Sequence, residues 1–510
     1  MQAKDIFSSS KFLSTGLRAS AYQYIAMVSS YVFNGLIYIY ILRKLDLEEF
    51  GLYSFLLTSI FLFRTIAFLG TDSVVQRYLP EYEERGDSYS AKRVLIGCMI
   101  VSFLAALLLC GLLLLFKNPI VTIFNLPEST KCFTWLVTVI VLLLVQSYLL
   151  GDVALVSLFK TRYVSFCRIF YNIVKLVLFY LALRMNYGIG GILRAWLLSE
   201  LLFLILISIK VWHSILLVPT GSHSFHPLPI DRFVHFAKYL YLNRLIYALR
   251  SQGVAIYILS YFFNITIVGI YSFCFGLPLL LMQLSPAIAL HSLFKSIVIK
   301  CHTKNQNYQD FSYLFKLFNR VTFFIMVPIM VFCIILADKI VLLLLNPDYM
   351  NMVHLFRLSL FLVMLYQFGF IYMPFIFATE KTKIIFITGL ILLSSIVLDI
   401  ILIPSYGVLG AICAFGITGL AVIIYLYWAI NKMIRLAYPW QSLAVFFINM
   451  LLAASVVYIL RAFINNVFSL VVVVTAGVIA YITFSYVNKG FTQQDRDYIN
   501  CAFNKNVWFF

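Results

Sequence analysis

The chain has 510 residues, of which 63% are hydrophobic and only 11% are charged. A soluble domain carries about 25% charged residues, so this composition excludes an assembly of ordinary soluble domains. The formal net charge of +18 does not indicate a nucleic-acid partner, because in a membrane chain it is first explained by basic residues that gather on the cytoplasmic side.

The first residues and the apolar runs that follow them predict a membrane protein. Residues 1–18 are polar and basic and lack the apolar core of a signal peptide, so we expect a cytoplasmic N-terminal segment. Runs of about 20 apolar residues then recur, which is the length that a helix needs to cross a bilayer. They predict fourteen helices at residues 19–42, 52–70, 94–116, 133–158, 164–183, 191–211, 237–261, 267–292, 317–337, 353–378, 384–403, 407–430, 441–460 and 467–487. We therefore expect an all-α integral membrane protein.

The basic residues predict the orientation of these helices. Both termini and the loops after even-numbered helices together hold about 23 Lys and Arg, whereas the opposite loops hold about 7. Because Lys and Arg concentrate on the cytoplasmic side, we expect both termini in the cytoplasm.

A loop that contains three prolines and a glycine separates the sixth predicted helix from the seventh. Pro and Gly stop helices and mark linkers, so residues 212–236 predict a cytoplasmic linker. The linker divides a first lobe, residues 19–211, from a second lobe, residues 237–430. Residues 441–487 then form two further helices, and residues 488–510 form a cytoplasmic tail.

Three short motifs recur at an offset of 218 or 219 residues. The pairs are GLYSF at 51–55 with GIYSF at 269–273, YGIGG at 187–191 with YGVLG at 406–410, and FKT at 159–161 with FAT at 377–379. They fall at equivalent places in the two sets of six helices, which indicates an internal duplication. Repeats with an even number of helices enter the membrane from the same side, so we expect two parallel lobes. Pro404 predicts the end of the eleventh helix, and Gly407 a tight turn after it.

Charged residues inside apolar helices are costly and therefore mark candidate functional residues. Two-lobed helical membrane proteins carry a substrate between the lobes by alternating access. Deep basic residues exceed deep acidic ones, and fixed positive charge in a low-dielectric cavity attracts anions. Arg suits phosphate because its guanidinium donates two parallel hydrogen bonds. We predict an anion path lined by Arg64, Lys175, Arg244 and Arg250.

Three acidic residues, Asp152, Glu200 and Asp399, also lie in predicted helices. Glu200 either neutralises Lys175 or a neighbouring Arg, or it titrates and couples transport to protons; the sequence leaves both roles open. Asp152 and Asp399 are candidates for ion coupling or pairing. The nine Cys form no CxxC pair, so we predict neither a metal site nor a cofactor. No GxxxxGK[ST] motif occurs, so the chain is not expected to be an ATPase.

Three motifs resemble a known family. RKLDLEEFGLYS (43–54), LLNPDYMNMV (344–353) and LIPSYGVLGA (402–411) are similar to motifs of the Wzx-type O-antigen flippases in the multidrug/oligosaccharidyl-lipid/polysaccharide (MOP) exporter superfamily. The resemblance covers about residues 11–488. It implies a MATE-like fold in the bacterial inner membrane and a non-enzymatic function. It also implies a substrate, the polyprenyl-pyrophosphate-linked repeat unit of an O-antigen, capsule or exopolysaccharide. Membrane lipids, a polysaccharide polymerase and a chain-length regulator are the further partners it suggests.

Two positions depart from the family pattern. Family members often carry an Asp shortly after a position like Arg250, whereas residues 250–257 read RSQGVAIY here. A coupling scheme that needs this carboxylate is therefore not expected. Asp399 falls where the family often has Asn, so a polar contact between helices is the alternative to a coupling role.

Three other functions stay open. A lipid II flippase also has fourteen helices and an anionic head group. A multidrug exporter of the same superfamily usually has twelve helices and needs buried carboxylates for cationic drugs. A membrane glycosyltransferase or polymerase is the third alternative, since Asp46 and Glu48 form a DxE pair in the first outer loop. The short outer loops argue against such an enzyme.

Overall fold

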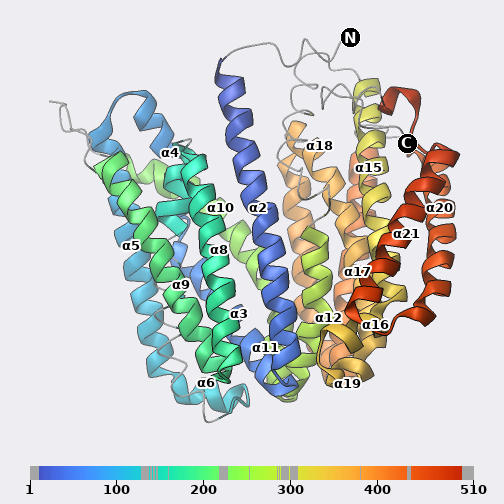
Figure 1. Ribbon diagram of the computed structural model, residues 1–510. Coiled ribbons are helices and arrows are strands. Elements are labelled where there is room, and N and C mark those ends of the chain that lie inside the picture. Colours follow the sequence, from blue (N-terminus) through green and yellow to red (C-terminus); the bar gives the residue numbers. More distant parts are fainter. Residues whose placement is uncertain are drawn as a thin grey trace. The chain divides into compact units, whose positions relative to one another are not determined.

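The computed structural model describes residues 11–127, 148–158, 160–216, 228–251, 253–283, 308–379, 381–432 and 438–496, with a few single positions between 137 and 298. All secondary structure in these residues is helical (Figure 1). Eleven of the described helices are long and apolar enough to cross a membrane, or twelve if the bent pair α10 and α11 is one span. The all-α membrane class is thus confirmed. The count of fourteen stays a prediction, because the first half of the predicted helix 133–158 and the end of the predicted helix 267–292 lie largely outside the described residues.

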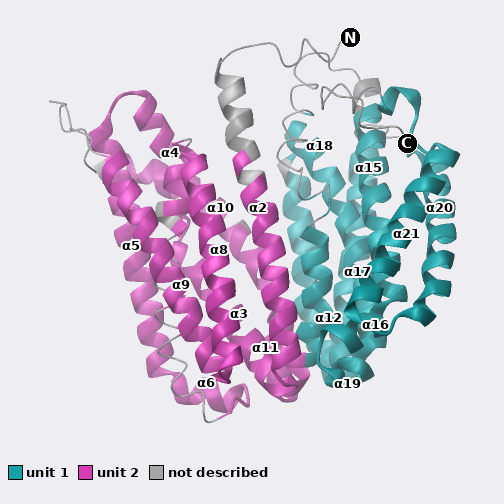
Figure 2. Cartoon of the chain, viewed as in Figure 1, with its two compact units in different colours: residues 1–10, 270–510 teal, residues 11–269 magenta. Residues whose placement is uncertain are grey.

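The contacts between residues divide the chain into two compact units, which Figure 2 colours separately. Unit 2, residues 11–269, holds the helices α2 (Lys11–Lys44), α3 (Leu47–Phe68), α4 (Thr71–Glu84), α5 (Ser88–Leu115), α6 (Lys117–Ile123), η2 (Tyr148–Leu155), α8 (Thr161–Arg184), α9 (Gly188–Val211), η3 (Trp212–Leu216), α10 (Ile230–Ser251) and α11 (Val254–Phe262). The helix α12 (Ile265–Gln283) begins in unit 2 and continues into unit 1.

Unit 1 holds the described residues from position 270 onward. Its described helices after α12 are α15 (Tyr308–Ile335), α16 (Ala337–Leu344), η4 (Pro347–Met352), α17 (Val353–Tyr366), η5 (Gln367–Tyr372), α18 (Met373–Ala378), α19 (Thr382–Asn431), α20 (Trp440–Leu460), η6 (Arg461–Phe463) and α21 (Val467–Asn488). α10 packs on α3 and α4, so the contact boundary falls after α11 rather than in the predicted linker. Residues 217–227 of that linker lie outside the described part, and α10 already begins at Ile230. The lobe boundaries stay predictions.

The glycines of one repeated motif meet each other in unit 2. A Cβ atom added to Gly51 of α3 would lie 2.9 Å from the amide nitrogen of Gly269 and closer still to the carbonyl oxygen of Ile265. A Cβ atom added to Gly269 would in turn meet the backbone of Leu47. The two backbones can approach this closely only because glycine has no side chain. Asp46 of the DxE pair is the N-cap of α3, because its carboxylate accepts a hydrogen bond from the amide of Glu49 at 2.7 Å.

The predicted eleventh and twelfth helices form one run, α19, with a break at Gly407. Gly407 has φ 54° and ψ −130°, a conformation that glycine adopts and other residues avoid. The prediction that Pro404 ends the helix is wrong, because the helical run continues through Pro404 to Gly407. Proline removes one hydrogen bond, but its φ fits a helix, whereas the φ and ψ of Gly407 lie outside the helical region.

The chain beyond α21 packs onto unit 1. Phe491 is 2% exposed, and its ring lies 5.4 Å from that of Phe324 and 5.0 Å from that of Phe446. Asp495 is fully buried and accepts a hydrogen bond from the Arg320 guanidinium at 2.6 Å. The beginning of the predicted tail is thus anchored within the helical bundle.

Candidate functional site

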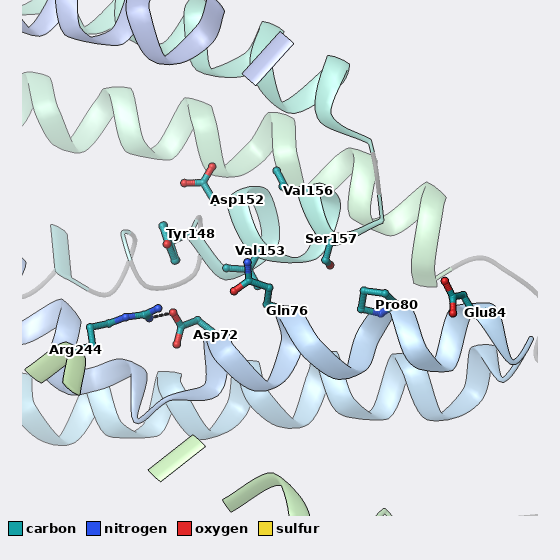
Figure 3. A pocket seen from close by; sticks show the side chains of 10 residues that line it. All are labelled: Asp72, Gln76, Pro80, Glu84, Tyr148, Asp152, Val153, Val156, Ser157 and Arg244. Atoms are coloured by element: carbon teal, nitrogen blue, oxygen red, sulfur yellow. Dashed lines mark ion pairs between the residues drawn. The ribbon is translucent and has the colours of Figure 1, made fainter. Parts of the chain in front are cut away.

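One face of α4 lines a cavity in unit 2. Asp72, Gln76, Pro80 and Glu84 follow each other at intervals of four residues, which places them along one side of a helix. Figure 3 shows them in a row, with Arg244 beside Asp72 at one end. They line a cavity of about 380 Å³ together with Tyr148, Asp152, Val153, Val156, Ser157 and Arg244.

Two of the polar residues that line this cavity come from the π-helix η2. Tyr148 and Asp152 are four residues apart in it, and both line the cavity. π-Helical segments are rare and occur frequently at functional sites. Val153, Ala154 and Leu155 of η2 are buried in one cluster with Leu95 of α5 and Ile207 of α9. This apolar packing fixes the polar side of η2 against the cavity.

An ion pair between Arg244 of α10 and Asp72 of α4 lies at one end of the row of lining residues (Figure 3). The side chain of Asp72 is 3% exposed, whereas that of Arg244 is 41% exposed. The second carboxylate oxygen of Asp72, Oδ1, is buried and has no hydrogen-bond partner among the described residues. The pair thus leaves acceptor capacity on Asp72 and donor capacity on Arg244.

Arg244 also lines a second cavity, of about 210 Å³, in which Arg64 of α3 lies. Phe61, Thr65, Phe68, Tyr148, Tyr247 and Ala248 complete its lining, so two guanidinium groups and no carboxylate face this space. Cζ of Arg64 lies 5.0 Å from the centroid of the Phe61 ring and 5.3 Å from that of Tyr148. Aromatic faces attract a cation without neutralising its charge. The Nε atom of Arg64 is buried and has no hydrogen-bond partner in the part of the chain that is described.

Lys175 of α8 lies among aromatic rings. Its Nζ is 5.8 Å from the ring of Tyr171, 5.5 Å from that of Phe179 and 5.1 Å from that of Trp196. Glu200, which is 3% exposed, accepts hydrogen bonds from Tyr171 at 2.6 Å and from Trp196 at 3.1 Å. Lys175 and Glu200 therefore share two aromatic neighbours, Tyr171 and Trp196. An ion pair between Lys175 and Glu200 stays a prediction.

A ring contact connects this cluster with the second cavity. The ring of Phe61, which lies beside Arg64, is 6.3 Å from that of Trp196. Arg64, Lys175 and Glu200 therefore belong to one network of aromatic and charged side chains within unit 2.

Arg168 of α8 is a further candidate, which is absent from the residues predicted from the sequence. It forms an ion pair with Asp152. The sequence does hold a signal for Arg168, because polar and aromatic residues recur in α8 in an i, i+3, i+4 pattern that places them on one face of the helix. These residues are Arg168, Tyr171, Asn172, Lys175 and Phe179. A polar and aromatic stripe of this kind on a membrane helix indicates a buried polar surface.

Two predicted residues, Arg250 and Asp399, are not among the residues that line these cavities. Arg250 is in the last turn of α10, and its side chain lies outside the described residues. Asp399 is buried in α19, which belongs to unit 1. The first cavity is lined by Asp72, Glu84 and Asp152 as well as Arg244, and the cationic path stays a prediction.

Comparison with solved structures identifies the fold. The lipid II flippase MurJ in an inward closed conformation matches with a TM-score of 0.70 and 17% identity, over 95% of this chain and 100% of that chain. A multidrug resistance MATE family transporter of the MOP superfamily matches with TM-scores of 0.61 in its inward-facing conformation, at 12% identity, and 0.56 in its outward-facing conformation, at 15% identity. These matches cover 80% and 81% of this chain and 94% and 95% of the transporter. At these identities the likeness shows a shared fold.

Comparison of sequences identifies the family. No curated protein sequence matches the chain. The model of a family described as "Polysaccharide biosynthesis protein" matches residues 17–294, which is more than half of the chain. This confirms at family level the resemblance that the motifs indicated: the chain is a multi-pass membrane protein that belongs to the polysaccharide biosynthesis protein family.

Proposed function

We propose that the protein is a flippase, not an enzyme, and that it carries a polyprenyl-pyrophosphate-linked oligosaccharide across the bacterial cytoplasmic membrane by alternating access. The oligosaccharide is the repeat unit of an O-antigen, a capsule or an exopolysaccharide. Both termini are in the cytoplasm in this proposal, and membrane lipids, a polymerase and a chain-length regulator are its partners. The family match and the fold shared with the lipid II flippase MurJ support lipid-linked cargo.

The observation that carries the proposal is the cavity with two guanidinium groups. Arg64 and Arg244 line one space without a carboxylate among its lining residues. A pyrophosphate is the anionic group of the proposed cargo, and guanidinium groups bind phosphate oxygens through paired, charge-assisted hydrogen bonds. The aromatic rings beside Arg64 hold the side chain in place without supplying a competing anion.

Lys175 and Glu200 are placed in the same network, and we propose that Lys175 adds to its positive potential. Arg250 remains part of the proposed path on sequence grounds alone. Asp152, Glu200 and Asp399 stay candidates for ion coupling or pairing; Asp152 has an ion-pair partner in Arg168.

The same cavity bears on the alternative cargoes. A cationic drug would be repelled by two guanidinium groups, so the second cavity disfavours a multidrug exporter. A lipid II precursor also carries a pyrophosphate, so it would satisfy this cavity equally well. Only the glycan attached to the carrier distinguishes these two cargoes.

Deletion of the gene in its host tests the proposal. We expect one polyprenyl-linked oligosaccharide to accumulate in the lipid extract, measured by mass spectrometry, while its surface polymer disappears. Complementation with Arg64→Ala or Arg244→Ala should not restore the polymer, whereas Arg77→Ala, which changes an exposed arginine of α4, should restore it. Unchanged lipid pools, together with increased sensitivity to cationic drugs, would contradict the flippase assignment.

A further inference from the structure

We propose that Asp72 is the resident anion of Arg244, which the phosphate group of the cargo displaces, and that the displaced carboxylate takes up one proton. This inference rests on the proposed function and adds a role for a residue that lies outside the predicted path.

The first step is the position of Arg244 between the two cavities. Its guanidinium pairs with Asp72 in the larger cavity and lines the smaller cavity with Arg64. A phosphate bound to Arg64 therefore lies within reach of Arg244. A phosphate group that carries two negative charges attracts the guanidinium more strongly than a carboxylate does at the same distance, so phosphate and Asp72 compete for Arg244.

The second step is the burial of Asp72. Its side chain is 3% exposed, and Oδ1 already lacks a hydrogen-bond partner among the described residues. Once Arg244 turns to the phosphate, Asp72 is a buried carboxylate without its counter-ion, and such a group is neutralised by protonation rather than left charged. Gln76 and Ser157 line the same cavity as Asp72, and in this proposal the proton arrives through that cavity.

The third step is the set of charges around Asp72. Arg64 of α3 and Arg244 of α10 favour the carboxylate anion, whereas Asp152 of η2 favours the acid. Glu84 lies twelve residues further along α4, about 18 Å from Asp72, so its effect is largely screened. The uncharged titratable groups that line the two cavities are Tyr148 of η2 and Tyr247 of α10, and the hydroxyl of Tyr241 of α10 donates to the carbonyl oxygen of Ile66 in α3. Asp152 is already paired with Arg168, so Asp72 is the carboxylate whose counter-charge changes when phosphate binds.

The sign of the pH effect follows from the proton count. The phosphate-bound state holds one proton more than the free state, so affinity should fall as the pH rises through the range in which Asp72 titrates. One bound proton corresponds to a tenfold change in affinity per pH unit.

Isothermal titration of the purified full-length protein with farnesyl pyrophosphate, in two buffers of different ionisation enthalpy, tests the inference. We expect the wild type to take up about one more proton per bound ligand than Asp72→Asn does, and we expect Asp72→Asn to bind at least tenfold more tightly. The control Asp231→Asn changes an exposed carboxylate of α10 and should match the wild type. Equal affinity and equal proton uptake in Asp72→Asn and wild type would overturn the inference while leaving the flippase assignment intact.

Two further outcomes are also decisive. If neither the wild type nor Asp72→Asn binds the pyrophosphate, the proposed function fails and the inference fails with it. If Asp72→Asn does not fold, the wild type is titrated with sulfate, a dianion that does not itself titrate near neutral pH. Its affinity should fall by about tenfold per pH unit, and an affinity independent of pH between about 5 and 8 would exclude protonation of Asp72.

Discussion

The contact between Gly51 and Gly269 makes a sharp prediction about stability. An added Cβ at Gly51 would lie 2.9 Å from the Gly269 nitrogen and closer to the Ile265 carbonyl oxygen. Both atoms belong to the backbone of α12, so no side chain can move aside and the helices themselves must separate. Overfilling a packed site costs about 1–3 kcal/mol, which we expect for Gly51→Ala.

The chain offers a matched control in α5. A Cβ added to Gly97 meets nothing within 4 Å, so Gly97→Ala should only gain helix propensity, about 1 kcal/mol. The two alanine variants should therefore differ by about 2–4 kcal/mol in free energy of unfolding. The assay is the temperature at which half of the purified protein leaves the monodisperse peak in size-exclusion chromatography after heating.

The partner glycine supplies an independent check. Gly269→Ala should destabilise the protein as Gly51→Ala does, and the double variant should lose less than the sum, because one added methyl group already separates the helices. Equal midpoint temperatures for Gly51→Ala and Gly97→Ala would refute the reasoning that the close backbone contact requires glycine at position 51.

Two further variants test other parts of the structure. Asp495→Ala leaves the buried guanidinium of Arg320 without its carboxylate, so it should destabilise the protein by about 3–5 kcal/mol. The control is Asp348→Ala, at an exposed site, whose stability in the same heating assay should stay within about 0.5 kcal/mol of wild type. Equal midpoint temperatures for Asp495→Ala and Asp348→Ala would show that the ion pair between Arg320 and Asp495 does not stabilise the protein. Lys175→Met keeps the aromatic cluster filled but removes its charge, so polymer export should fall at least tenfold with an unchanged midpoint temperature. Full export by this variant would remove Lys175 from the proposed path.

The sequence alone determined the class of fold and the types of residue that matter. Hydropathy is a local property, and a membrane helix must be apolar along its whole length, so the apolar runs located most of the described spans. For the same reason each charge within a run is conspicuous, and Arg64 and Arg244 stand out in the sequence in this way. The repeated glycines are also visible, because a motif at a constant offset is a property of the sequence alone.

Only the tertiary structure decided which of these residues act together. Asp72 is 172 positions from Arg244 in sequence, and nothing local links a carboxylate at the start of α4 with a guanidinium in α10. The same holds for Asp152 with Arg168, which depends on a π-helix that composition does not reveal. Pairing depends on the directions in which packed helices turn their side chains, whereas hydropathy averages over direction. The sequence therefore predicted a cationic path, and the packing showed that its Arg244 is shared between a carboxylate and a cavity lined by a second arginine.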